Sequence, residues 1–184
     1  MVHTKKIIKD TFWELLEEKP YNKITVQDIV GRCHVNRNTF YYHFQDIPTL
    51  MTDSIEDWMD EVISQYGMAE SPADCLIYIG QEFMKRRKAF LHLFRYVQKE
   101  AFLSKMNKMI YNVIQRYVDG IAEYRQISKT EKETLIRCYK CVFTGSLLDW
   151  LEEGASYDLP EFYEELCKTF AGARERALLG RRSE

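Results

Sequence analysis

Apolar residues recur every three to four positions along nearly the whole chain, whereas the two-residue alternation of a half-buried strand is almost absent. This pattern predicts an all-α fold. Helices are expected over residues 4–18, 26–32, 37–44, 48–66, 73–85, 89–97, 102–124, 129–153 and 160–178.

Helix boundaries are marked by local signals. Ser128 and Glu131 have the spacing of a capping box, which predicts a helix start. Gly154 supplies the residue type that most often ends a helix. The stretch GMAESP at residues 67–72 is the clearest break, and it separates short helices from longer ones.

The helix at 26–32 has a second capping signal. Thr25 is a favourable N-cap, and Asp28 stands three residues later, where a capping box places an acidic residue. Ile24 and Ile29 have the spacing of a hydrophobic staple across this helix start. A short helix with a fixed entry angle is therefore predicted.

The stretch VNRNTFYYHF, residues 35–44, has the same kind of signal at a helix start. Val35 and Phe40 have staple spacing, and Phe40 and Phe44 anchor one helix face. At about 100° per residue, Asn38 and Tyr42 point away from that face. The exposed side therefore carries hydrogen-bonding groups and flat rings.

Only residues 33–35 separate these two helices, which is the length of a helix-turn-helix turn. The turn lacks glycine, so a left-handed conformation at His34 would cost roughly 1 kcal/mol relative to glycine. Arg, Asn and Thr side chains suit base edges, and tyrosine hydroxyls suit phosphates. The pattern indicates a helix that enters the major groove of DNA, against the alternative of a surface helix with ordinary polar cover.

The segments ITVQDI (24–29) and NRNTFYYHFQDI (36–47), with Val35 between them, resemble the N-terminal domain of TetR/AcrR-family regulators. Across residues 143–154, FTGSLLDWLEEG is similar to the branch of dihydroxyacetone-operon regulators. The resemblance implies a helix-turn-helix DNA-binding domain over 1–47 and a helical effector-binding and dimerisation domain over 48–184. The residues it implies for DNA binding are Thr25, Asn36, Arg37, Asn38, Thr39, Tyr41, Tyr42 and His43.

One position departs from the family pattern. The family usually opens the fourth helix with a lysine that meets a phosphate, and this chain has Ile47 followed by Pro48. The loss of this phosphate contact would lower the affinity for DNA, or reduce its dependence on salt by the share of about one phosphate.

Charge and cysteine content change this picture little. Formal net charge is −2, but residues 1–50 hold seven basic and six acidic residues against 19 and 22 in the remainder. Five cysteines without a signal peptide suit a reducing cytoplasm, and no apolar run is long enough for a membrane span.

Cys138 and Cys141 form a C-x-x-C in mid-helix that we interpret as packing, and no metal or cofactor site is expected. The basic run at 85–88 is interpreted as a solvated turn.

In the larger domain, the resemblance implies a two-fold dimer through the last two helices and a small-molecule pocket. The candidate dimer-interface residues are Leu147, Trp150, Leu151, Phe162 and Leu166. Abundant aromatics suit either an ordinary core or a pocket for an apolar or aromatic effector; they are Phe83, Phe90, Phe94, Tyr96, Tyr111, Tyr117, Tyr124 and Tyr139. One or two polar groups would orient such an effector, and the candidates, among which the sequence does not select, are His92, Arg95, Arg116 and Glu123.

The chain is therefore expected to be a homodimeric repressor that binds a palindromic operator and is released by a small effector. A transcriptional activator is one alternative. A helical ligand-binding or interaction protein with a weakened DNA-binding head is another, motivated by Ile47 and the acidic overall charge. No arrangement of nucleophile, acid–base pair, metal ligands or phosphate loop indicates an enzyme.

Overall fold

The computed structural model describes residues 2–66, 72–97, 99–120 and 128–179, and all regular structure within these ranges is helical. The N-terminal helices are α1 (Val2–Glu18), the 3₁₀ turn η1 (Tyr21–Lys23), α2 (Val26–Arg32), α3 (Arg37–His43) and α4 (Ile47–Tyr66). The remaining helices are α5 (Pro72–Lys85), α6 (Arg87–Tyr96), α7 (Lys99–Gly120), α8 (Lys129–Glu152) and α9 (Leu159–Leu179).

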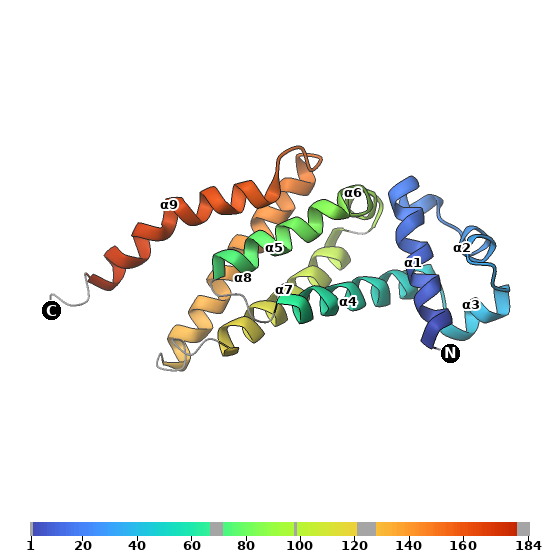
Figure 1. Ribbon diagram of the computed structural model, residues 1–184, viewed down its shortest axis with the longest axis horizontal. Coiled ribbons are helices and arrows are strands. Elements are labelled where there is room, and N and C mark those ends of the chain that lie inside the picture. The colour runs from blue at the N-terminus through green and yellow to red at the C-terminus, as the bar shows by residue number, and fades with distance from the viewer. Residues whose placement is uncertain (1, 67–71, 98, 121–127, 180–184) are drawn as a thin grey trace.

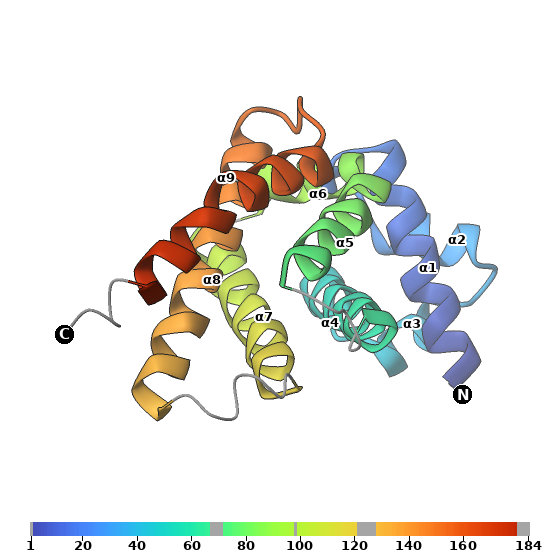
Figure 2. The same cartoon turned by 60° about the vertical axis from the view of Figure 1, so that its left-hand side comes forward.

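Helices α1, α2 and α3 gather at one end of the molecule, and α4 leads from them into the larger helical body (Figure 1). In that body α5 packs along α9 and α7 along α8, while α6 lies against α1. The far end of α9 projects from the body on the side away from α1–α3, as both views show (Figure 2). The all-α prediction is confirmed for the described residues.

The helix starts predicted from capping signals are confirmed. Thr25 and Ser128 each form a complete capping box, with Asp28 and Glu131 respectively. At the end of α8, Gly154 takes the left-handed conformation with φ of 68°, and Ala155 follows with φ of 56°. Two successive left-handed residues turn the chain sharply between α8 and α9.

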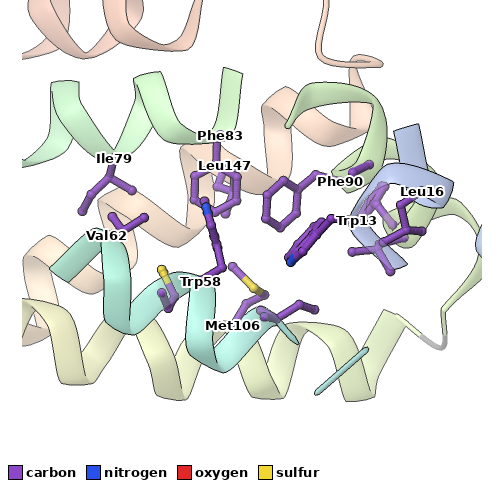
Figure 3. Close-up of a cluster of buried hydrophobic side chains, with 14 of the residues drawn as sticks. Trp13, Leu16, Trp58, Val62, Ile79, Phe83, Phe90, Met106 and Leu147 are labelled. Atoms are coloured by element: carbon purple, nitrogen blue, oxygen red, sulfur yellow. The ribbon is translucent and has the colours of Figure 1, made fainter. Parts of the chain in front are cut away.

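A continuous hydrophobic core runs from the N-terminal helices into the body. The ring of Trp13 on α1 lies 6.1 Å from that of Trp58 on α4 and 5.8 Å from that of Phe90 on α6. Phe83 on α5 extends the cluster, with its ring 4.5 Å from Phe90 (Figure 3). Each such aromatic side chain contributes roughly 2–3 kcal/mol by leaving water, so the core joins the two parts firmly.

Helices α5 and α9 approach closely because α5 carries a glycine at the crossing. A Cβ added to Gly80 would lie 3.0 Å from the Tyr163 ring and 3.2 Å from the Pro160 backbone nitrogen. The Tyr163 hydroxyl lies 3.0 Å from Ser146 Oγ of α8, so this ring ties three helices together.

Three of the five candidate dimer-interface residues are buried within the single chain. Leu147, Trp150 and Leu151 lie in the core of the single chain, because the inner face of α8 packs against the body. Phe162 is exposed and Leu166 is half-buried, so these two candidates remain at the surface of α9.

Two further residues correct the interpretation of the C-x-x-C. Both Cys138 and Cys141 are exposed on the outer face of α8, so packing within the chain does not explain them. Val142 on α8 and Phe170 on α9 are exposed as well, Phe170 by 60%. The outer surfaces of α8 and α9 therefore carry apolar and thiol groups that the chain itself leaves uncovered.

Candidate DNA-binding surface

The start of α2 is fixed by a hydrogen-bonded cluster around Asp28. Its carboxylate accepts bonds from the Thr25 backbone N–H at 2.8 Å and from the Thr25 hydroxyl at 2.7 Å. Lys19 Nζ lies 2.8 Å from the same carboxylate. The bond to Lys19 first, and then those from Thr25, lower the pKa of Asp28 to about 2. Thr25 itself stays exposed at the surface, as its expected phosphate contact requires.

The start of α3 is fixed by Asn36. Its Oδ1 accepts a bond from the Thr39 backbone N–H at 2.8 Å and a second from the Thr39 hydroxyl at 3.0 Å. Phe40 and Phe44 are fully buried beneath the helix, their rings 6.0 Å apart. The Asn36 cap and the two buried phenylalanines together fix the orientation of α3, and hence which of its faces is exposed.

The outer face of α3 carries the exposed candidates. Tyr42 is 71% exposed and Tyr41 49% exposed, unusual values for tyrosine. Arg37 and Asn38 are also exposed, and Arg37 Nη2 lies 3.5 Å from the Tyr41 hydroxyl. Rings, a guanidinium and an amide thus share one accessible surface.

Two candidates are less accessible. His43 and Thr39 are half-buried, and the His43 ring lies edge-on to that of Tyr42 at 5.1 Å. The Thr39 hydroxyl already donates to Asn36. His43 and Thr39 therefore lie at the edges of the exposed face of α3, not at its centre.

The turn between α2 and α3 is held by His34 in the left-handed conformation, with φ of 54°. The sequence raised this conformation as a condition of the tight turn, and it is confirmed. The Val35 N–H then bonds to the Val30 carbonyl at 3.2 Å. The two short helices are thereby locked in a helix-turn-helix arrangement.

Ile47 opens α4 as a half-buried residue packed against the core. Just before it, Asp46 Oδ1 accepts a bond from the Thr49 N–H at 2.8 Å, and bonds from Thr49 lower the pKa of Asp46. The position where the family resemblance leads us to expect a lysine thus has an apolar side chain beside a carboxylate. The expected loss of a cationic phosphate contact here stays a prediction.

Salt bridges that the sequence did not reveal tie α1 to α4. Lys9 is buried, and its Nζ lies 2.5 Å from Asp57 Oδ2 and 3.2 Å from the Asp53 carbonyl. Lys5 Nζ lies 2.9 Å from Asp53 Oδ2. The signal available in the sequence was a lysine next to Ile8, within the apolar stripe of the first helix. These contacts hold α4 against α1.

A second connection joins α1 to α6. His92 Nδ1 lies 2.6 Å from the Leu16 carbonyl, which can only accept, so this nitrogen donates. The Arg86 guanidinium lies 4.5 Å from the centre of the Trp13 ring, and burial lowers the pKa of Arg86. The basic run at 85–88 is thus not wholly a solvated turn, since Arg86 packs between the two parts of the molecule.

The proposed ligand groups are scattered. Phe83, Phe90 and Phe94 are buried core residues, whereas Tyr96 and Tyr111 are exposed. His92 is engaged with α1, and Arg95 is exposed on α6. The side chain of Tyr117, and residues Glu123 and Tyr124, lie outside the described residues.

Two cavities lie beside α4. One is apolar, about 30 Å³ in volume, and lies between α4, α5, α7 and α8. The other, of about 290 Å³, is a groove between α4 and α7.

Within the described ranges, no cluster of three or more His, Cys, Asp or Glu side chains is placed to hold a metal ion. Nor does any helix there combine the length and apolar character needed to cross a membrane.

The capped helix pair, its tight turn and the exposed face of α3 coincide with a match to a family model. Residues 8–51 match the model for bacterial regulatory proteins of the tetR family, and residues 70–172 match that for a transcriptional regulator C-terminal region. The chain belongs to the TetR family. The two matches together span most of the chain, which confirms the resemblance expected from the sequence.

Curated relatives are transcriptional regulators. The chain is 29% identical over 92 residues to the HTH-type dhaKLM operon transcriptional activator DhaS of Lactococcus lactis subsp. lactis (strain IL1403), covering 48% of this chain and 49% of that protein. It is 32% identical over 73 residues to the HTH-type transcriptional regulator YxbF of Bacillus subtilis (strain 168), covering 39% of this chain and 19% of that one. The matches thus span about half of DhaS and less of YxbF.

Solved structures share the fold over nearly the whole chain. The dihydroxyacetone kinase operon activator DhaS superposes with a TM-score of 0.70 at 17% identity, over 94% of this chain and 97% of that one. A TetR/AcrR-type regulator of Aquifex aeolicus VF5 gives 0.59 at 19% identity, over 91% and 98%. NalD, a repressor of a multidrug efflux pump in Pseudomonas aeruginosa, gives 0.60 at 18% identity, over 92% and 96%.

Proposed function

We propose that the protein is a sequence-specific DNA-binding regulator, that it acts in the cytoplasm as a homodimer, and that α3 is its DNA-reading helix. The observation that carries this proposal is the outer face of α3. Arg37, Asn38 and the two exposed tyrosines lie there, opposite the buried Phe40 and Phe44. Such side chains supply the contacts that major-groove readers make to bases and phosphates.

The surface divides into two kinds of contact. Arg37 and Asn38 suit base edges, because Arg pairs with guanine and Asn with adenine in the major groove. Thr25 and the tyrosine hydroxyls suit phosphates, which position the protein without reading sequence. Asn36, Thr39 and His43 complete the set by orienting the helix and flanking its exposed face.

A dimer follows from the geometry of DNA reading, because helix-turn-helix proteins place two reading helices about 34–36 Å apart on a palindrome. The outer surfaces of α8 and α9 suit this contact. Val142, Phe162 and Phe170 are exposed there. Of the five candidates from sequence, Phe162 and Leu166 lie where a partner can reach them.

We also propose that a small effector alters DNA binding through α4. The salt bridges from Lys5 and Lys9 to α4 support this route, since movement of α4 would carry the N-terminal helices with it. An effector shifts the equilibrium only by its differential affinity for the DNA-binding and released states. Release of a bound repressor is the main proposal.

A gel-shift assay with the DNA upstream of the chain's own gene, at two salt concentrations, tests this function. We expect a specific shift that weakens with salt, because phosphate contacts release counterions. Tyr42→Ala and Arg37→Ala should each weaken binding by about tenfold, the loss of one good base or phosphate contact. The absence of a specific shift at low salt would contradict the proposal.

Matched controls separate DNA contact from folding. Tyr96→Ala and Arg87→Ala remove the same side chains from the exposed surface of α6 and should leave the gel shift unchanged. All four variants should melt within a few degrees of the parent protein, as exposed positions usually do. A large fall in melting temperature for Tyr42→Ala would mean that this residue is structural.

Activation is a second candidate, favoured by the similarity to DhaS, which is described as an operon activator. Activation and repression can be distinguished with a reporter gene placed under the control of the promoter that the protein binds. Repression predicts higher output when the protein is removed, and activation predicts lower output. The similarity to NalD, described as a repressor, shows that the fold accommodates either.

A further inference from the structure

A groove of about 290 Å³ runs between α4 and α7, which lie side by side (Figure 1). Helix α7 contributes three residues spaced by four positions, which places them on one helix face. The lining residues are Glu56, Met59, Asp60, Ile63, Lys108, Asn112 and Arg116. The groove therefore has a mainly acidic wall on α4 and a basic wall on α7.

The two walls differ in how far their polar groups are satisfied. Arg116 lies 3.9 Å from Asp60, so these charges already face one another. Neither Lys108 nor Asn112 makes a hydrogen bond or ion pair with another described residue. Glu56, by contrast, has an interaction within the chain. Lys108 and Asn112 are exposed on α7, so within the described residues the Lys108 ammonium and the Asn112 amide are available to a ligand, and the ammonium favours an anionic group.

The floor of the groove is Met59. Its side chain is only 3% exposed and also lines the apolar cavity of about 30 Å³ on its other side. Leu76, Ile110 and Phe143 are among the apolar residues around that cavity. The space is close to the size of one methyl or methylene group. Because Met is unbranched and flexible, the Met59 thioether can turn into this cavity and deepen the groove.

The groove borders the contacts that hold the DNA-binding helices. Asp53 and Asp57 on α4 bind Lys5 and Lys9 of α1, and Glu56 and Asp60 of the same helix line the groove. A ligand wedged between α4 and α7 would therefore act directly on the helix that supports α1.

We propose that this groove binds small amphipathic carboxylates. The carboxylate is held by Lys108 and Asn112, with Arg116 nearby, and the hydrocarbon part lies on Ile63 and displaces Met59 inward. Binding itself does not depend on the proposed DNA function. Its regulatory effect rests on that function, because only a DNA-binding protein can be released by movement of α4.

The test uses a matched series of octanoate, octanamide and octan-1-amine on the full-length protein without DNA, with binding measured by calorimetry and by ligand-observed NMR. We expect octanoate to bind, octanamide to bind at least about tenfold more weakly, and the amine to show no specific binding, since charge-assisted hydrogen bonds are the stronger ones. Equal binding of the three, or no binding of octanoate, would overturn the proposal.

Two variants locate the site. Lys108→Gln should weaken octanoate binding by about five- to tenfold, whereas Lys88→Gln, at an exposed lysine on α6, should leave it unchanged. Met59→Leu keeps the volume but not the flexibility, and should weaken octanoate more than butanoate, which does not reach the floor. If Lys88→Gln weakens binding as much as Lys108→Gln, the groove is not the site.

A gel shift with added octanoate then tests the regulatory step separately. Octanoate should reduce the shift of the parent protein and have less effect on Lys108→Gln. Binding of octanoate by a protein that shifts no DNA would leave the groove assigned and contradict only the proposed function.

Discussion

At the scale of single residues, Asp28 shows how a surface carboxylate can organise a functional element. It joins Thr25, at the start of the helix pair proposed to face DNA, to Lys19, which directly follows α1. Because these bonds need the ionised form, they lower the pKa of Asp28 from an ordinary 3.8 to about 2.

The pH dependence of stability follows from the sign of that shift. A carboxyl group with a lower pKa in the folded state stabilises the fold above its unfolded pKa, and the contribution is lost as pH falls through about 2. Asp28→Asn should therefore lower the melting temperature at neutral pH, with a difference that shrinks toward pH 2. Gln27→Asn, its uncharged neighbour on α2, should show a difference that does not change with pH. A pH-independent effect of Asp28→Asn would contradict the assignment.

His34 is a residue whose backbone could be anticipated but not decided from sequence. The short distance between the two helices demanded a left-handed residue, yet no glycine was present to mark it. The observed φ of 54° shows that the chain accepts roughly 1 kcal/mol of strain to close the turn.

At the scale of helices, the sequence predicted where helices begin, but it did not predict which helices contact one another. The caps at Thr25 and Ser128 were predicted correctly because N-capping involves residues only three apart. The salt bridge of Lys9 with Asp57 and the bond from His92 to Leu16 join residues far apart in sequence. The outer face of α3 was predicted because Phe40 and Phe44 fix it locally, whereas burial of Trp150 in the chain's own core depended on tertiary packing.

The crossing of α5 and α9 gives a test at this scale. Gly80→Ala should destabilise the protein by about 1–3 kcal/mol, the range for forcing extra volume into a packed interface. The backbone nitrogen of Pro160, 3.2 Å from the new methyl group, cannot move aside as a side chain would. Chemical denaturation measures the change.

Gly31→Ala is the matched control for that substitution. Gly31 lies in α2 with nothing within 4 Å of an added Cβ, so alanine should stabilise the helix by roughly 0.5–1 kcal/mol. Equal effects of the two substitutions would mean that the α5–α9 crossing is looser than the distances indicate.

At the scale of the whole molecule, the two parts implied by the resemblance share one core through Trp13, Trp58 and Phe90. A rearrangement between them must therefore be a small shift of packed helices, in which α4 and α6 move together with α1. This favours an effector that works at the edge of the core, as a ligand in the α4–α7 groove would.

The proposed dimer can be tested through its exposed thiols. Cys138 and Cys141 should react with a thiol reagent at low protein concentration and become protected at concentrations where sedimentation shows a dimer. Cys75 should stay unreactive throughout, because burial raises the pKa of its thiol to about 11. Full reactivity of both outer thiols in the dimer would place the interface away from the outer face of α8.

The first turn of α1 lies against the end of α3, with the Lys5 ammonium 5.5 Å from the centre of the Phe44 ring. In contrast, α9 ends at the opposite extremity of the molecule (Figure 1). If α3 reads DNA as proposed, an affinity tag or fluorescent fusion placed before Val2 would lie beside it and reduce the measured DNA binding. A tag for purification or surface immobilisation is better placed on the α9 side, which lies away from the proposed DNA-reading helix.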